Sequence, residues 1–175
     1  LSSAYIMAQT GNSVTEEHWN LLHTLANHAA TRWTEPDGGI WEVRGGPFHF
    51  VHSKVMCWVA LDRAIKLGQE TGHLDDIAKW EATAEAIKAQ VLEKGWNEEK
   101  QAFVQHYDTD AVDASNLLIP IVGFLPDDDP RVVSTVARIQ QELQNGAFVH
   151  RYRTAKTDDG LTGDEGAFTL CSFWL

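Results

Sequence analysis

The sequence has little of what marks membrane, nucleic-acid-binding or disulfide-stabilised proteins. Its 175 residues include two cysteines, and 14 Lys and Arg stand against 25 Asp and Glu, which gives a formal charge of −11. Nucleic acids and anionic membranes attract clustered basic side chains, so this balance argues against both as partners. The longest apolar run, LLIPIVGFL at 117–125, is far shorter than the roughly 20 residues that cross a bilayer. Neutral and cationic ligands remain open.

Several catalytic and cofactor motifs are also missing. The sequence contains neither G-x-G-x-x-G nor G-x-x-x-x-G-K-[ST], the glycine-rich phosphate loops, and no G-x-S-x-G nucleophile motif. Cys57 and Cys171 lie in apolar helical patterns, which predicts two buried thiols rather than a redox pair. The sequence therefore predicts no nucleotide cofactor and no acyl transfer, and the thiols fit a reducing, cytoplasmic setting.

The two ends lack the usual signals of a complete chain. Residues 1–8, LSSAYIMA, contain no initiator Met and no basic or apolar region of a signal peptide. At the other end LCSFWL stops without a helix cap, a glycine or a polar tail. We therefore expect this chain to be a fragment of a longer protein.

Apolar residues recur at helical spacing along most of the chain. The capping-box pattern of Ser13 and Glu16 predicts a first helix that continues to about Trp33, with Trp19, Leu22, Leu25 and Ala26 on its apolar stripe. Further helices are expected at about 51–70, 74–94, 114–124, 130–144 and from 164 to the end. We expect a kink at Pro120, and an Asp cap before Pro130 in the first turn of the 130–144 helix. Amphipathic and largely apolar helices alternate, which predicts an all-α fold with an outer solvated layer and an inner covered layer.

The loops predicted between these helices differ in length. Those at about 34–50, 95–113 and 145–163 are long, whereas the turns at 71–73 and 126–129 are short. In an up-and-down array the three long loops share one end, and long loops commonly carry function. We therefore expect that end to be the working face. The segments AFVQHYDTD and AFVHRYR within these loops could pair as small strands.

Seven carboxylates lie in the first long loop and at residues 158–165, and two of them stand out. Glu42 follows Trp41 in GGIWEVRGG, where the indole could exclude water from the carboxyl and favour its protonated form, as an acid needs. Glu165 lies in GDEGAF at the start of a predicted helix, where the helix N-terminus favours an ionised carboxylate, as a base needs. Most loop carboxylates are only solvated, and an ordinary N-terminal helix acid remains an alternative for Glu165.

Histidines and tryptophans give two further hypotheses. His49 and His52 at i and i+3 suggest a metal site, but no H-E-x-x-H is present, so we favour hydrogen-bonding histidines and predict no metal. Trp41 and Trp96 lie in or beside the long loops, where an exposed indole can stack on a sugar ring. An alternative for Trp96 is that it anchors its loop.

Four segments in this order resemble a known family. They are EPDGGIWEVRGGPFHFVHSKVMCWVALDRAIKL, DASNLLIPIVGFLPDDDPRVVSTV, HRYR and GDEGAFTLCSFWL. Together they resemble bacterial glucoamylase-like members of glycoside hydrolase family 15, a group that includes glucoamylases, glucodextranases and some trehalases. The resemblance covers nearly the whole chain from about Arg32 onward.

The resemblance implies an (α/α)6 barrel of which residues 1–175 are a part, with an N-terminal β-sandwich and the first barrel helices outside this chain. It also implies an inverting hydrolase that releases glucose from the non-reducing end of an α-glucoside, either an oligosaccharide or a disaccharide. The family's general acid falls on Glu42 and its general base on Glu165. Inversion requires the two carboxyls to lie roughly 6.5–9.5 Å apart, with a water between base and sugar.

The remaining candidate residues are those placed to contact sugar hydroxyls or rings. They are Trp41, Arg44, His52, Trp96 and Arg151. The linkage that is cleaved stays open among α-1,4, α-1,6 and trehalose. An alternative from another class is a catalytically inactive barrel fragment that only binds carbohydrate.

Overall fold

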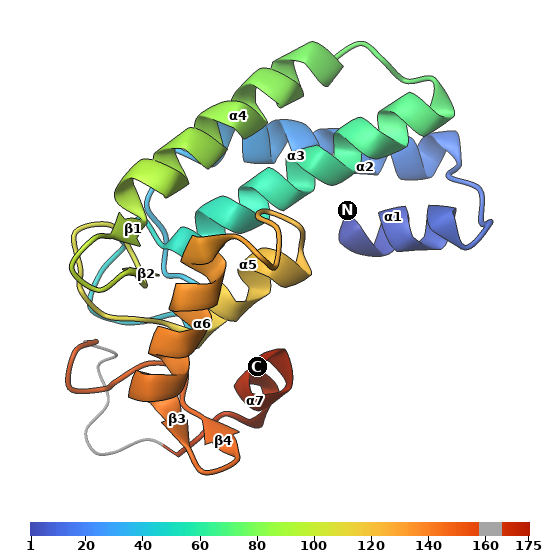
Figure 1. Ribbon diagram of the computed structural model, residues 1–175. Helices are drawn as coiled ribbons and strands as arrows, with labels where there is room; N and C mark the ends of the chain where they lie inside the picture. The colour runs from blue at the N-terminus through green and yellow to red at the C-terminus, as the bar shows by residue number, and fades with distance from the viewer. Residues whose placement is uncertain (158–165) are drawn as a thin grey trace. The chain divides into compact units, whose positions relative to one another are not determined.

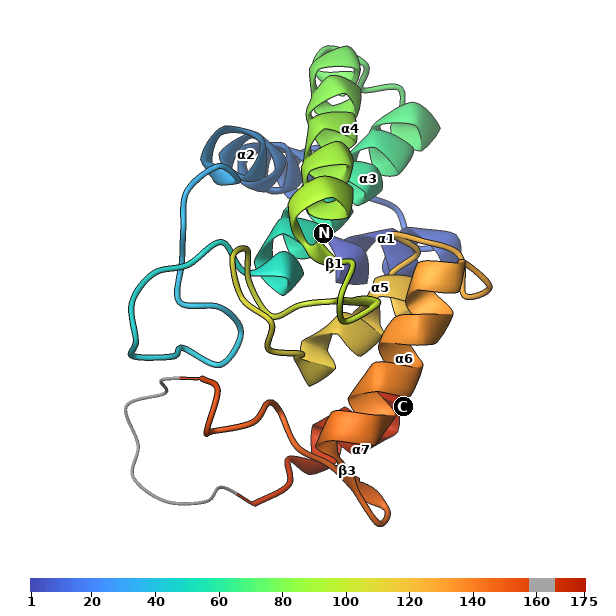
Figure 2. The ribbon, with the colours of Figure 1, turned by 60° about the vertical axis from the view of Figure 1, so that its left-hand side comes forward.

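The computed structural model describes residues 1–157 and 166–175, and these are mainly helical with a few two-residue strands (Figures 1 and 2). The chain divides into two compact units. The first unit comprises Leu1–Glu35 and Lys54–Ala89, and the second comprises Pro36–Ser53 and Gln90–Leu175. In the described residues, no helix combines the length and the apolar character that crossing a membrane requires.

The first unit is built from α1 (Ser2–Gln9), α2 (Glu16–Arg32) and most of α3 (Val51–Thr71) and α4 (Ile77–Lys94). Within it, α3 and α4 run side by side in opposite directions (Figure 1). Its interior consists of buried apolar side chains from α2, α3 and α4, namely Trp19, Leu22, Ala26, Val55, Trp58, Val59, Leu61, Ala64, Leu67, Trp80, Ala84 and Ile87.

The start of α2 differs from the prediction. The N-cap is Thr15, whose hydroxyl accepts a hydrogen bond from the backbone N–H of His18 at 3.2 Å, and Ser13 lies before the helix. The capping box expected at Ser13 was therefore wrong by two residues. Leu25 of the expected apolar stripe is 46% exposed. Helix α1 was not predicted, and its eight residues contribute no buried side chain.

A buried lysine holds the end of α2. Lys54 is 1% exposed, and its ammonium donates to the backbone carbonyls of Trp33 at 2.6 Å and Glu35 at 2.5 Å. The last carbonyls of a helix lack partners within the helix and carry partial negative charge, so a cation there stabilises the helix end. The apolar spacing of α3 places Lys54 on the buried face of the helix. The reason for its charge is visible only in these two contacts with the end of α2.

The second unit contains short elements joined by long loops. Strand β1 (Trp96–Asn97) pairs with β2 (Ala102–Phe103), and β3 (Gln144–Asn145) pairs with β4 (Phe148–Val149), both antiparallel. The other elements are η1 (Ala114–Leu117), α5 (Leu118–Ile121), α6 (Pro130–Leu143) and α7 (Thr169–Trp174). The two segments expected to form small strands therefore each contribute to a local hairpin. The apolar core comprises Ala102, Val112, Ala114, Leu117, Ile139, Leu143, Val149 and Cys171.

The helix expected at 114–124 is interrupted. Its first part is a 3-10 turn and its second part is the short α5, which ends at Ile121. Pro120 supplies no backbone N–H, and Gly123 has the left-handed φ of 77° that commonly ends helices. A kink at Pro120 was expected within a longer helix, but α5 ends one residue later at Ile121, so the prediction of a helix that continues to Phe124 was wrong.

Other helix predictions agree with the structure to within a few residues. Helix α6 begins with Pro130 after the cap Asp129, which accepts from the backbone N–H of Arg131 at 2.9 Å, as predicted. The last helix begins at Thr169 rather than near 164, and residues 158–165 lie outside the described part. Cys171 is buried as predicted, whereas Cys57 is only half-buried.

Candidate functional site

The loop between α2 and α3 is closed at its neck by backbone hydrogen bonds. Asp37 and Phe48 exchange two of them, each 2.9 Å long. The carboxylate of Asp37 also accepts from the backbone N–H of Gly39 at 2.6 Å and from the hydroxyl of Ser53 at 2.8 Å. These two short hydrogen bonds to the Asp37 carboxylate fix the neck of the loop formed by residues 38–47.

Glu42 lies at the tip in an unusual backbone conformation. Its φ is 51°, in the left-handed region that few non-glycine residues adopt. Its backbone N–H donates to the carbonyl of Gly39 at 3.3 Å, and that of Val43 donates to Gly38 at 3.1 Å. Backbone strain of this kind persists where the surroundings fix it, and it is enriched at functional sites.

The residues on both sides of Glu42 are packed while Glu42 itself is exposed. Val43 is buried in a small cluster with Phe50 and Tyr152, and the half-buried Trp41 packs against the same cluster. The turn therefore directs the carboxyl of Glu42 outward. We expected the indole of Trp41 to keep water away from the carboxyl of Glu42. Among the described residues it does not: the indole N–H points to another carboxylate, and Glu42 is exposed.

That carboxylate belongs to Asp113, which is 1% exposed. The indole N–H of Trp41 lies 3.0 Å from both of its oxygens. The side-chain amide of Gln105 donates to it at 2.8 Å, and Ser115 donates from its backbone N–H at 2.8 Å and its hydroxyl at 2.6 Å. A buried carboxylate is stable only when it is so well hydrogen-bonded.

Gln105 extends this network to a third segment. Its carbonyl oxygen accepts from the hydroxyl of Thr157 at 3.0 Å, and its backbone carbonyl accepts from the N–H of Val51 at 3.0 Å. Both Gln105 and Thr157 are buried. The side-chain amide of Gln105 thus links Thr157 to Asp113, and the backbone of the same residue binds the start of α3.

Arg151 lies on the aromatic side of Trp41. Its guanidinium carbon is 5.3 Å from the centroid of the Trp41 ring, 5.2 Å from Tyr152 and 5.9 Å from Phe168. Its backbone carbonyl accepts from the N–H of Ala114 at 2.8 Å. Cation–π contacts at such distances favour a fixed guanidinium. Trp41 is therefore held by Asp113 at its N–H and by Arg151 at its ring.

These contacts join the three long loops that the sequence predicts to share one end. Trp41 comes from the first, Asp113 ends the second and Arg151 lies in the third, and all three belong to the second unit. The predicted site residues Glu42, Arg44, His52 and Trp96 also belong to this unit. Glu165 lies outside the described residues.

The remaining predicted residues differ in their surroundings. Arg44 is exposed. Trp96 is half-buried, and its ring meets Phe103 of the paired strand edge-on at 5.4 Å, a contact that agrees with the loop-anchor alternative. Sugar binding by Trp96 stays a prediction. In the described ranges, no group of three or more His, Cys, Asp and Glu side chains is placed to hold a metal ion.

His52 lies in the first turn of α3 and is half-buried. Burial lowers the pKa of its imidazole, and the carboxylates of Asp113 and Asp37 partly oppose that shift. A neutral imidazole at neutral pH can both donate and accept hydrogen bonds, as a sugar hydroxyl requires.

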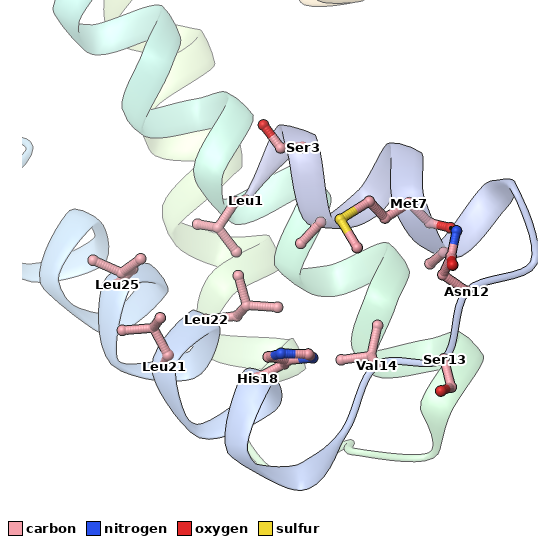
Figure 3. A pocket seen from close by; sticks show the side chains of 12 residues that line it. Leu1, Ser3, Met7, Asn12, Ser13, Val14, His18, Leu21, Leu22 and Leu25 are labelled. Atoms are coloured by element: carbon pink, nitrogen blue, oxygen red, sulfur yellow. The ribbon is translucent and has the colours of Figure 1, made fainter.

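Two hollows differ in chemistry. In the second unit a more polar one of about 240 Å³ is lined by Val43, Phe48, Gln105, His106, Thr109, Lys156 and Thr157. In the first unit an apolar one of about 360 Å³ lies between α1 and α2. Figure 3 shows the side chains of Leu1, Met7 and Leu22 lining this space. The polar hollow offers hydroxyl, imidazole and amide groups, which suit a polar ligand.

Sequence reasoning missed Asp113 and Gln105. Asp113 stands directly before the run ASNLL, so an N-cap could have been suspected from the pattern. Nothing in a single sequence indicates the bond to Trp41, because the two residues are 72 positions apart. The same holds for the link between Gln105 and Thr157, which spans 52 positions.

Comparison with known proteins gives a consistent result. The family model described as Glycosyl hydrolases family 15 matches residues 1–175. Trehalase of Mycobacterium tuberculosis is 50% identical over 175 residues, which are 100% of this chain and 26% of that protein. Trehalase of Thermoplasma volcanium is 39% identical over 169 residues, 96% of this chain and 27% of that protein. The chain thus spans about a quarter of the length of these relatives.

Solved structures agree in fold. A structure described as Glycosidase E178A matches with a TM-score of 0.79 at 19% identity, over 96% of this chain and 43% of that one. A second, described as Glycosidase E335A in complex with glucose, has a TM-score of 0.73 at 21% identity, over 83% of this chain and 38% of that one. At these identities the likeness concerns the fold.

Proposed function

The chain belongs to the glycosyl hydrolases of family 15, and from that premise we propose that the protein containing it hydrolyses an α-linked glucoside, with trehalose as the first candidate substrate. The observation that carries the proposal is the family match over all 175 residues together with 50% identity to a trehalase. Among the α-glucosides left open by the sequence, the names of the relatives favour trehalose over the glucoamylase-like substrates that the sequence placed first.

We further propose that residues 1–175 form part of an (α/α)6-barrel catalytic domain, with outer amphipathic and inner apolar helices. The helical content and the fold similarity to two glycosidases support this architecture. The remaining barrel helices and an N-terminal β-sandwich would then lie in the rest of the protein. Such a barrel would supply the pocket walls that residues 1–175 cannot supply alone.

In the proposed reaction Glu42 is the general acid and Glu165 the general base. The carboxylate of Glu165 takes a proton from a water whose oxygen attacks the anomeric carbon. The bond from that carbon to the bridging oxygen breaks, and Glu42 gives its proton to the leaving oxygen. One β-glucose and one glucose that keeps its α configuration result from trehalose. The outward direction of the Glu42 side chain and its fixed turn support the role of acid.

Sugar contacts are proposed for Trp41, Arg44, His52, Trp96 and Arg151. Three features of the second unit support them: the partly exposed indole of Trp41, the guanidinium of Arg151 beside it, and the imidazole of His52 at the base of the loop. Aromatic faces suit the C–H faces of glucose, while guanidinium and imidazole groups suit its hydroxyls.

The test uses the complete protein with trehalose, and with maltose, isomaltose and dextran as alternatives. Replacing Glu42→Gln or Glu165→Gln should lower kcat by about 10²–10⁴-fold, because each removes a proton-transfer group while conserving shape. Substrate binding should stay measurable by calorimetry. Near-normal turnover of either variant would contradict the assignment, and binding without turnover by the unaltered protein would favour the inactive carbohydrate-binding alternative.

Stereochemistry provides an independent test of the same proposal. Immediately after trehalose is added, anomer-resolved NMR should record α- and β-glucose in equal amounts, since inversion at one anomeric carbon leaves the other unchanged. With maltose the newly released non-reducing glucose should be β. Only α-glucose from trehalose would indicate retention of configuration and would contradict the two-carboxylate arrangement proposed above.

A further inference from the structure

We propose that Asp113 is a positioning residue that holds Trp41, and through Trp41 the general acid Glu42, in the geometry that catalysis requires. The inference rests on the proposed function, because it assigns the acid role to Glu42. It concerns a side chain that is 1% exposed and acts through the turn at 38–43.

Asp113 holds Trp41 more firmly than a neutral side chain would. Its two oxygens receive the indole N–H of Trp41, the amide of Gln105 and both donors of Ser115, at distances between 2.6 and 3.0 Å. All of these partners are donors, and an ionised carboxylate is the side chain that only accepts. Hydrogen bonds to an ionised acceptor are roughly twice as strong as those between neutral groups.

Trp41 in turn determines where Glu42 lies. The two residues are adjacent, and the left-handed φ of 51° at Glu42 is a conformation that the chain does not favour by itself. Val43 anchors the far side of the turn by packing against Phe50 and Tyr152. The near side is anchored by the indole of Trp41, so weakening its bond to Asp113 allows the carboxyl of Glu42 to move.

A displaced acid has a distinctive kinetic consequence. Departure of a sugar alcohol needs a proton at the leaving oxygen, whereas fluoride leaves α-glucosyl fluoride with little need for one. A variant with a misplaced acid therefore loses activity on trehalose and retains it on α-glucosyl fluoride. A variant that is merely less stable, or that has a disturbed sugar pocket, loses activity on both.

The experiment compares Asp113→Asn with the unaltered complete protein on these two substrates. Asn keeps the shape of the side chain but replaces one acceptor oxygen by a donor, which disturbs at least one of the bonds to Trp41 and Gln105. We expect kcat on trehalose to fall by about 10- to 100-fold, the cost of a misplaced catalytic group. Activity on α-glucosyl fluoride should fall much less.

The matched control is Asp129→Asn. Asp129 is also an N-cap that accepts from the backbone N–H two residues on, at 2.9 Å, but it starts α6 and pairs with Arg131. Its replacement should lower the melting temperature without changing the ratio of activities on the two substrates. Glu42→Gln serves as the reference for a lost acid and should show the largest change in that ratio.

A second variant covers the case in which Asp113→Asn does not fold. Trp41→Phe keeps an aromatic ring and removes the N–H that Asp113 binds, so it should shift the ratio in the same direction. Adding Asp113→Asn to Trp41→Phe should then cost less than it costs alone, because the shared bond is already absent.

Three outcomes separate the two proposals. If Glu42→Gln leaves trehalose hydrolysis intact, the proposed function itself is wrong. If Glu42→Gln changes the ratio of activities but Asp113→Asn and Trp41→Phe lower both activities equally, the positioning role is wrong and the function stands. If both variants keep full activity on trehalose, the positioning role is likewise wrong.

Discussion

The two units bury different kinds of side chain. In the first unit the buried residues are almost all apolar, and the exception is Lys54, which binds the end of α2. Among the described residues of the second unit six polar side chains are buried, namely Gln105, Asp113, Ser115, Asn116, Thr135 and Thr157. The first unit is stabilised mainly by the hydrophobic effect, and the second depends in addition on matched hydrogen bonds.

This difference has a physical consequence for function. Apolar packing tolerates many arrangements of similar volume, whereas a buried polar group has few positions in which its bonds are satisfied. The second unit holds every described candidate site residue. Its buried hydrogen bonds therefore restrict side-chain positions more than apolar packing does in the first unit. Changes in the first unit should act on stability, and changes in the second should act on catalysis as well.

Trp80→Ala should give the largest loss of stability. Trp80 is fully buried in the first unit, its ring lies 6.2 Å from that of Trp19, and its N–H donates to Asn27 at 3.2 Å. Removing it should cost about 3–5 kcal/mol, through lost burial and a cavity. Melting temperature should fall sharply while kcat per folded molecule stays unchanged. Trp80→Phe should recover most of the loss. A fall in kcat without a fall in melting temperature in Trp80→Ala would contradict the claim that the first unit acts on stability alone.

Gly39→Ala should give a smaller loss of stability and a clear loss of activity. Gly39 has a φ of 68°, and an added Cβ would lie 2.9 Å from ring atoms of Phe50, which is 3% exposed. Strain and crowding should cost about 1–3 kcal/mol. Because the carbonyl of Gly39 accepts from Glu42 within the turn, kcat on trehalose should fall about tenfold or more.

Gly38→Ala is the matched control for that change. The Cβ added there would meet only the Cα of Glu42 at 3.7 Å, an ordinary contact, and the backbone of Gly38 is not left-handed. Melting temperature and kcat should both stay near those of the unaltered protein. If Gly39→Ala left kcat as unchanged as Gly38→Ala does, the turn would tolerate displacement. Catalysis would then be no more sensitive to changes in the second unit than to changes in the first.

Periodicity predicted the long helices well and the short ones poorly. The spans expected at 51–70 and 130–144 are observed at Val51–Thr71 and Pro130–Leu143, because many buried positions share one face. The region 114–124 carries few residues and contains Pro120 and Gly123, so local backbone geometry overrides its apolar pattern. Helix α1 buries no side chain and therefore has no periodic signal to read.

The candidate site could be predicted in part for a different reason. Loop length and residue type pointed to Trp41 and Glu42, because long loops commonly carry function, and Arg151 was added after the family resemblance. The sequence contained no sign that Asp113 receives the indole of Trp41, since that bond depends on how distant segments fold. The proposed water exclusion at Glu42 failed for the same reason: the direction in which an indole points is a tertiary property.

Acid should weaken the second unit before the first, through His52. Burial lowers the pKa of His52, and the N-terminal turn of α3 also disfavours a positive charge. An unfolded chain binds that proton at a pKa of about 6.5, so folding stability is complete above this pH and decreases as pH falls toward the lowered folded value. In the first unit, hydrogen bonds from Asn27 and His23 lower the pKa of Asp76, and its contribution is lost only as pH falls below its ordinary value of 3.8.

His52→Gln tests whether acid weakens the second unit first. Its effect on stability should be smaller than those of Trp80→Ala and Gly39→Ala. Gln cannot take up a proton, so the variant should lose less melting temperature than the unaltered protein between pH 7.5 and 5.5. Asp76→Asn should leave that difference unchanged, because Asp76 acts in a more acidic range. Equal pH dependence of His52→Gln and the unaltered protein would mean that the buried imidazole is protonated without cost. The attraction of Asp113 and Asp37 for the imidazolium would then outweigh the effect of burial, and the pKa of His52 would not be lowered.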